Sequence, residues 1–227
     1  MEIHTTTAQT FSAKLIQIPD PPTVLWYRGS LPPEGHRVLA VVGSRSLSAY
    51  GKASCEYLIA GLSGYPITIV SGLALGADAC AHRAALNAGL HTIAVPGSGL
   101  DDAHLYPRTN LPLAKEILQS GGTLLSEHPQ GHRARAEDFP SRNRIMVGLS
   151  DAVLVIEGGE KSGTLITARL APEYNRDLLC VPHRIGDAHG VAAHTFIRLG
   201  AVLVSTPAHI LEALGIPVST EEEKYGV

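Results

Sequence analysis

Short apolar runs that alternate with longer helix-period segments constrain the fold of this chain more than any other feature. The runs are apolar throughout rather than at every second residue, which is typical of strands buried on both faces of a parallel sheet. The expected strands are residues 38–42, 67–70, 92–95, 123–125, 152–156, 178–181 and 202–204. The expected helices are residues 49–62, 77–88, 111–119, 142–149, 165–174, 192–199 and 207–214. The alternation predicts an α/β fold with a doubly wound, mostly parallel sheet and helices on both faces.

Three parts of the chain differ in pattern. Residues 1–36 are rich in proline and hold one expected strand, residues 24–27, which ends before Gly29. We interpret them as an N-terminal arm with a short edge strand. Residues 37–216 then form one domain that carries the ligand site, and residues 217–227 form an acidic tail.

Composition limits the possible functions. The chain has 227 residues, is 44% hydrophobic and carries a formal net charge of -3, which argues against a protein that coats DNA through its overall charge. Cys55, Cys80 and Cys180 are isolated, so neither a zinc site nor a disulfide framework is expected, and a cytoplasmic location is favoured. No signal peptide and no apolar run of about 18 residues is evident, so no membrane partner is expected.

The motif Arg142-Asn143-Arg144 follows Asp138-Phe139-Pro140 and precedes an apolar strand. We predict a helix start here. Arginines at the positive end of a helix are unfavourable unless an anion compensates them, so the motif favours phosphate binding over a plain solvated helix start. Asn143 either contacts a base edge or orients a neighbouring group.

Two turns after predicted strands also suit phosphates. Gly43-Ser44-Arg45 follows the first core strand, and free backbone amides at the next helix start would add to it. The turn from Gly158 to Thr164 is no P-loop, because Glu160 precedes Lys161 and the glycine spacing is wrong, so an ATPase is excluded. The alternative for both turns is ordinary strand–helix connection with side-chain capping.

Ten residues are therefore candidates for binding phosphate or DNA: Gly43, Ser44, Arg45, Arg142, Asn143, Arg144, Lys161, Ser162, Gly163 and Thr164. No catalytic residue, metal ligand or cofactor is expected. Asp78 and His82 are four residues apart, which fits a metal pair less well than a helix packed on the sheet. Tyr106 either stacks on a base or anchors its loop. Residues 128–135 offer a basic rim that nearby carboxylates dilute.

An ordered set of short motifs carries a family resemblance over residues 24–204. The motifs are Val41-Val42-Gly43-Ser44-Arg45, Ser71-Gly72-Leu73-Ala74, Gly76-x-Asp78-x-x-Ala81-His82, Gly99-Leu100-Asp101, Tyr106-Pro107, Leu125-Ser126-Glu127, Phe139-Pro140-x-Arg142-Asn143-Arg144 and Ser162-Gly163-Thr164-Leu165-Ile166-Thr167-Ala168. Together they resemble the DNA-processing protein A family (DprA, also called Smf).

The resemblance implies an extended Rossmann-like domain that binds single-stranded DNA without catalysis. It implies a homodimer, with residues 165–199 as its surface, that protects incoming strands during natural transformation and helps to load a RecA-type recombinase. The motif-matched residues would line the strand-binding pocket, and Lys161 adjoins them.

This chain departs from the family pattern at Leu75 and Ala77, and again at Pro182-His183 and 192–194. An alternative is a phosphoribohydrolase of the Lonely Guy (LOG) type, which acts on nucleoside monophosphates and has a similar glycine turn. Thr167 stands where that turn has its glutamate, so hydrolysis would need Glu157 or Glu173 as a substitute.

Overall fold

The computed structural model describes residues 2–160 and 162–218. One nine-stranded sheet runs through the described chain in the order β1-β2-β6-β5-β4-β3-β7-β8-β9. Its strands are β1 (His4–Thr6), β2 (Leu25–Gly29), β3 (Arg37–Val42), β4 (Ile67–Ser71), β5 (His91–Ala94), β6 (Thr123–Ser126), β7 (Ala152–Val155), β8 (Asp177–Cys180) and β9 (Val202–Leu203). The helices are α1 (Ala8–Phe11), α2 (Ala49–Ala60), α3 (Ala77–Asn87), α4 (Leu111–Gln119), α5 (Asp138–Leu149), α6 (Gly163–Glu173), α7 (Val191–Arg198) and α8 (Pro207–Ala213).

The chain reverses its direction of travel across the sheet at β3. Strands β3 to β6 step outward to one side, and β7 to β9 step outward to the other, all parallel to one another. Strand β2 pairs antiparallel with β6, and β1 pairs antiparallel with β2, so among the described strands only β2 runs against the others. The loops that follow the neighbouring strands β3 and β7 therefore leave the same edge of the sheet in different directions, which opens a crevice there.

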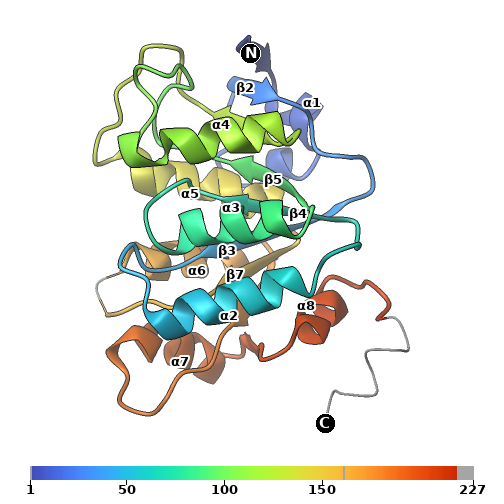
Figure 1. The fold of residues 1–227 in the computed structure, drawn as a ribbon, viewed down its shortest axis with the longest axis vertical. Coiled ribbons are helices and arrows are strands. Elements are labelled where there is room, and N and C mark those ends of the chain that lie inside the picture. The colour runs from blue at the N-terminus through green and yellow to red at the C-terminus, as the bar shows by residue number, and fades with distance from the viewer. Residues whose placement is uncertain (1, 161, 219–227) are drawn as a thin grey trace.

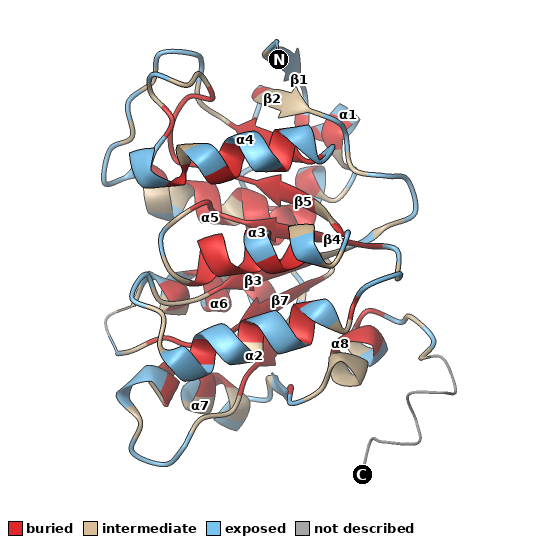
Figure 2. Ribbon diagram, in the orientation of Figure 1, coloured by how far each residue is buried: buried red, intermediate tan, exposed pale blue. Residues whose placement is uncertain are grey.

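Helices cover both faces of the sheet (Figure 1). Strand residues alternate between the two layers: Leu39 and Val41 pack under α2, α3 and α8, whereas Ala40 and Val42 pack under α5, α6 and α7. A third cluster fills the space between α3, α4 and the strands β5 and β6. The sheet and the inward helix faces are buried, while the outward faces of α2 and α4 are largely exposed (Figure 2).

This arrangement confirms the predicted Rossmann-like α/β fold with a mostly parallel sheet. The seven predicted core strands and all seven predicted helices are present, most with ends shifted by one to two residues. The predicted start of one helix is wrong. Helix α5 begins at Asp138, four residues before the predicted position. The reason is that Pro140 lies within the first turn of this helix, where proline is tolerated, and does not precede the helix.

The N-terminal residues differ from prediction in the unpredicted short helix α1 and in the position of β2. The strand expected at residues 24–27 is present as β2, but it lies between β6 and an unpredicted β1, so it is not the edge. Strand β1 is three residues long and lacks an apolar pattern, which left no signal in the sequence. The predicted acidic tail falls mostly outside the described residues. No helix in the described ranges is both long and apolar enough to cross a bilayer.

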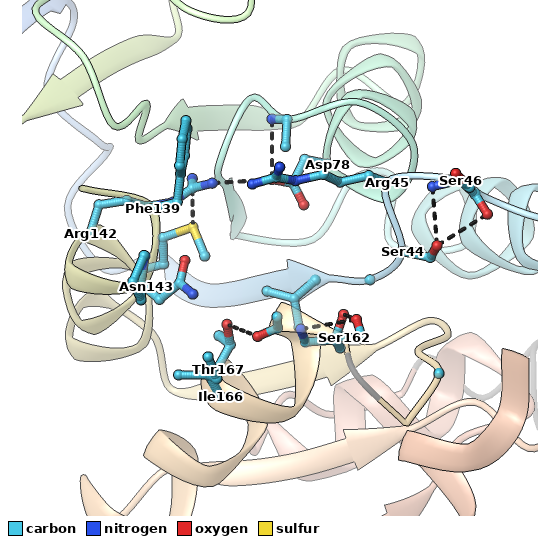
Figure 3. A pocket seen from close by; sticks show the side chains of 18 of the residues that line it. Ser44, Arg45, Ser46, Asp78, Phe139, Arg142, Asn143, Ser162, Ile166 and Thr167 are labelled. Carbon is cyan, nitrogen blue, oxygen red and sulfur yellow. Dashed lines mark hydrogen bonds and ion pairs between the residues drawn. The ribbon is translucent and has the colours of Figure 1, made fainter. Parts of the chain in front are cut away.

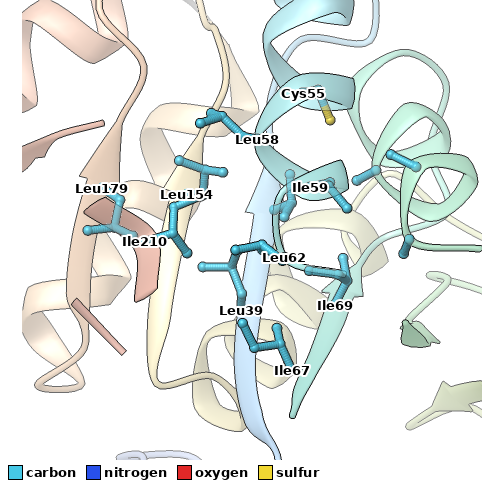
Figure 4. Packing of buried hydrophobic residues seen from close by; sticks show 14 of the residues in the cluster. Leu39, Cys55, Leu58, Ile59, Leu62, Ile67, Ile69, Leu154, Leu179 and Ile210 are labelled. Carbon is cyan, nitrogen blue, oxygen red and sulfur yellow. The ribbon is translucent and has the colours of Figure 1, made fainter. Parts of the chain in front are cut away.

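Leu39 lies at the centre of the layer between the sheet and α2 and is fully buried (Figure 4). We expect Leu39→Ala to lower the free energy of unfolding by about 2–5 kcal/mol, because it removes buried apolar surface and leaves a cavity. The control is Ile185→Ala, a residue that is fully exposed, which we expect to change stability by less than about 0.5 kcal/mol. Urea denaturation of both variants measures the difference, and equal values would contradict the packing described.

Candidate nucleic-acid interface

A cavity of about 650 Å³ opens at the carboxyl ends of β3 and β7, where the strand order reverses (Figure 3). Loops after both strands, the β4–α3 loop and the first half of α5 form its walls. Its lining residues are Val42, Gly43, Ser44, Arg45, Ser46, Ala74, Asp78, Ala136, Phe139, Pro140, Arg142, Asn143, Met146, Gly159, Ser162, Gly163, Thr164, Ile166 and Thr167. Eight of the ten candidate residues thus meet at one cavity, although they come from three separate segments of the chain.

Arg45 is an exposed cation in the lining of the cavity. Its guanidinium carbon lies 5.0 Å from the centre of the Phe139 ring, a distance suited to a cation–π contact. The turn that carries Arg45 is held by close packing against the next loop. Gly76 has a φ of 73°, and a Cβ there would lie 2.2 Å from the Ser44 carbonyl oxygen, so only glycine fits.

The start of α6 forms the opposite wall. Ser162 caps this helix, and its Oγ accepts a hydrogen bond from the Thr164 amide at 3.1 Å. Gly163 and Thr164 are the first two helical residues, so the positive end of the α6 dipole faces the cavity. The tenth candidate, Lys161, lies outside the described residues.

The start of α2 is already neutralised by an internal carboxylate. Glu157 follows β7 and is fully buried. Its Oε1 accepts a hydrogen bond from the Ser48 amide at 2.9 Å, and its Oε2 accepts one from the Ser48 hydroxyl at 2.6 Å. Gly51 leaves room for this carboxylate, since a Cβ there would lie 2.3 Å from Oε2. The Ser48 hydroxyl also accepts from the Gly51 amide at 2.9 Å, so two of the amides expected to be free for a phosphate at this helix start are bonded internally.

Arg142 extends beneath the cavity instead of projecting into it, and its side chain is 6% exposed. The guanidinium donates to the Val95 carbonyl at the end of β5 and lies 3.7 Å from an Asp78 oxygen. It occupies the space above Gly72, where a Cβ would lie 1.5 Å from Nη1. Arg142 thus ties α5 to the ends of β4 and β5.

Asp78 and Arg142 form a buried, loosely paired couple. Burial raises the pKa of the Asp78 carboxyl, and the charge of Arg142 opposes that shift. The Ala74 amide also donates to Asp78 at 3.2 Å. The pair holds the loop after β4 in place at the cavity wall, because each group depends on the other for its charge compensation.

The other two residues of the Arg142-Asn143-Arg144 motif have different positions: Asn143 lines the cavity and Arg144 does not. Asn143 lines the cavity and is 9% exposed. Arg144 is absent from the lining: its Nη2 lies 2.5 Å from Glu127 and its Nε lies 3.3 Å from Asp20. Both arginines have carboxylate partners and sit beyond the first turn of α5, so the argument that the helix dipole demands an external anion is wrong.

Several cavity residues were not predicted. Phe139, Ile166 and Ala136 join the lining, and Ile166 is 49% exposed. Phe139 had a usable signal, an aromatic residue just before an arginine-rich helix, but the others have none. Tyr106 is 47% exposed, with its ring centre 5.7 Å from that of Phe139.

His82 packs within the fold as expected. Its Nδ1 lies 2.8 Å from the Thr92 hydroxyl, and burial lowers its pKa to about 3, so it is neutral at physiological pH.

Fold and cavity together define a Rossmann-like α/β protein with an anion-suited site where the strand order reverses. The family model described as DNA recombination-mediator protein A matches residues 2–215. The chain belongs to this family, the DNA-processing protein A or Smf family, which confirms the resemblance seen in the sequence.

Relatives agree in sequence and structure. Protein Smf of Escherichia coli is 41% identical over 207 residues, or 91% of this chain, and the chain spans 55% of that relative's length. The solved structure of DprA from Streptococcus pneumoniae superposes with a TM-score of 0.87 at 37% identity, covering 93% of this chain and 74% of the other. The solved structure of DNA processing protein A from Helicobacter pylori, which was reported with that protein's mode of binding single-stranded DNA, gives a TM-score of 0.81 at 28% identity. That match covers 92% of this chain and 95% of the other.

We expect Arg142→Met to lower the free energy of unfolding by about 3–5 kcal/mol at pH 7, because it leaves Asp78 buried without its counter-charge. Loss of Arg142 also raises the pKa of Asp78 further above its value in the unfolded chain. The folded variant then holds a proton that the unfolded chain has released. Relative to wild type, the variant is therefore least destabilised below about pH 4, and its deficit in stability grows as the pH rises.

Urea denaturation of Arg142→Met and wild type between pH 4 and 7 tests this pH dependence. The double variant Arg142→Met/Asp78→Asn should recover stability at pH 7, since it has no carboxylate to ionise. A stability difference that is the same at every pH, with no recovery in the double variant, would show that Asp78 and Arg142 are not coupled.

Proposed function

We propose that this chain binds single-stranded DNA at the cavity between β3 and β7 without catalysing a reaction. The observation that carries the proposal is the pairing of exposed Arg45 on one wall with the positive end of α6 on the other. A guanidinium and helix-start amides both bind phosphate oxygens, and neither selects a base. Sequence preference is therefore slight, and binding weakens as salt rises.

Roles within the site follow from burial. Gly43, Ser44 and Arg45 form one wall and Ser162, Gly163 and Thr164 the other. Lys161, the residue before Ser162 in the sequence, stays a candidate for contact with phosphate. Asn143 extends from α5 into the lining of the cavity and contacts the bound DNA directly. Arg142 and Arg144 act through the fold, because their charges are taken up by internal carboxylates.

Apolar groups on the cavity rim favour a single strand over a duplex. Phe139 lies under Arg45, and the exposed side chain of Ile166 also lines the cavity. An unpaired base has a free face that packs on such groups, whereas the bases of a duplex are stacked on one another. The description of the Helicobacter pylori relative as a single-stranded DNA binder agrees with this choice of ligand.

We further propose that the chain acts in the cytoplasm as a homodimer during natural transformation and recombination. It would protect incoming strands there and help to load a RecA-type recombinase. Joining two cavities raises avidity without new contacts, which matters for a chain whose net charge is -3. The expected dimer surface, residues 165–199, includes the exposed side chain of Leu199, and the exposed apolar residues Val202 and Leu203 follow it in the sequence.

The phosphoribohydrolase alternative gains no support from the positions of the carboxylates. Thr167 lines the cavity where the hydrolase pattern has glutamate. Glu157 is fully buried against Ser48, and Glu173 is the last residue of α6, at the end away from the cavity. We expect no free base to be released when the protein, or its Thr167→Glu variant, is incubated with nucleoside monophosphates. Release by the wild type in a chromatographic assay would contradict the non-enzymatic proposal.

Arg45→Ala tests the binding site most simply. We expect it to weaken binding to a labelled oligothymidine by about 10–100-fold, because a hydrogen bond to a charged group contributes about 1.5–3 kcal/mol. The slope of log affinity against log salt concentration should become less steep by about one, because one phosphate contact is lost. Fluorescence anisotropy across a salt series measures both quantities.

Arg83→Ala is the matched control, because Arg83 on α3 is also exposed but does not line the cavity. It should change affinity less than about twofold. Equal losses in the two variants would mean that Arg45 acts through general charge only. Circular dichroism spectra that match the wild type would show that neither change alters the fold.

A further inference from the structure

A histidine–carboxylate cluster lies next to the cavity, on the segment between β6 and α5. His128, His132 and Asp138 each present a possible metal-ligand atom, and these three atoms all lie within 4.8 Å of one another. His132 Nε2 is 2.8 Å from one oxygen of Asp138, and His128 Nε2 is 3.6 Å from the other. Two imidazole nitrogens therefore face the two oxygens of one carboxylate.

The protein's own groups do not satisfy every polar atom of this cluster. His128 Nε2 is shielded from solvent and has no hydrogen-bond partner. The two imidazole rings are stacked, with centres 4.0 Å apart and planes 8° from parallel, so two charged rings would repel each other. A buried polar atom without a partner is unfavourable unless something else satisfies it. A cation between the nitrogens and the carboxylate would do so.

The backbone around the cluster is fixed by hydrogen bonds that do not use the ligand atoms of the histidines. The His128 amide donates to Ser126 Oγ at 3.0 Å, and the His132 carbonyl accepts from the Gly99 amide at 3.0 Å. The Arg135 amide donates to Asp138 at 2.7 Å. In metal sites, hydrogen bonds of this kind around the coordinating residues hold those residues in the orientation that binds the ion.

We propose that His128, His132 and Asp138 bind a divalent transition-metal ion of the zinc class. Two imidazole nitrogens and one carboxylate are a ligand set that suits Zn²⁺ and leaves a fourth position open. Magnesium prefers oxygen ligands and fits this set poorly. Small side-chain rotations bring the three atoms to the separation of about 3.3 Å that tetrahedral bonds of 2.0–2.1 Å require.

The ion changes both the order and the charge of the cavity rim. It links the segment 128–132 to the first residue of α5, whose next residues, Phe139 and Pro140, line the cavity. With both histidines neutral, the cluster's charge changes from one negative to one positive when the ion binds. The ion therefore favours an anionic ligand close to Arg45, in addition to the protein's own positive groups.

Isothermal titration calorimetry of Zn²⁺ into chelator-stripped, tag-free protein tests this site directly. We expect about one Zn²⁺ per chain, much weaker binding of Mg²⁺, and a higher melting temperature with Zn²⁺ than without it. His128→Gln/His132→Gln should weaken Zn²⁺ binding by more than about 100-fold, because loss of even an outer partner costs up to that much. The same variant should melt at one temperature with and without Zn²⁺.

The matched control is His4→Gln/His189→Gln, which removes two exposed histidines elsewhere and should keep the site. If the double ligand variant does not fold, Asp138→Asn replaces it, because an amide oxygen still accepts from the Arg135 amide. Absence of Zn²⁺ binding in the wild type, retention of it in the ligand variants, or equal binding of Mg²⁺ would overturn the proposal. The titration contains no DNA, so these outcomes are independent of the strand-binding proposal.

Discussion

The reversal of strand order at β3 is the constraint on which the site depends. Strands β3 and β7 are hydrogen-bonded neighbours, yet α2 and α6 that follow them pack on opposite faces of the sheet. Their connecting loops must separate at the carboxyl edge, and the cavity is the space between them. This separation places the loop that carries Arg45 and the start of α6 on opposite walls of the cavity.

Internal charge compensation decides which positive groups remain for a ligand. Glu157 occupies the start of α2, Asp78 lies beside Arg142, and Glu127 with Asp20 holds Arg144. These pairs fix loops and α5 around the cavity but leave little charge in it. Within the described part of the lining, Arg45 and the start of α6 remain. A chain with a net charge of -3 therefore needs a shaped site, and avidity, to hold a polyanion.

Strand and helix positions were largely predictable, because apolar runs such as Val38–Val42 report burial on both faces directly. The start of α5 was not, since Pro140 is compatible with both a helix boundary and a first turn. The candidate site was predictable as a set of turns and motifs. The interaction partners of the site residues were not predictable. Nothing in the sequence indicates that Arg142 pairs with Asp78, 64 residues away, or that Glu157 bonds to Ser48, 109 residues away. The approach of His132 to Asp138 likewise depends on the conformation of an irregular loop.

The central claim is that a single strand lies in the cavity between β3 and β7. Hydrogen–deuterium exchange of the protein, with and without an unlabelled oligothymidine, tests it most directly. The account predicts slower amide exchange in residues 43–46 and 162–167, with no change in β1 or α8, which lie away from the cavity. Protection confined to other segments, with these two ranges unaffected, would contradict it.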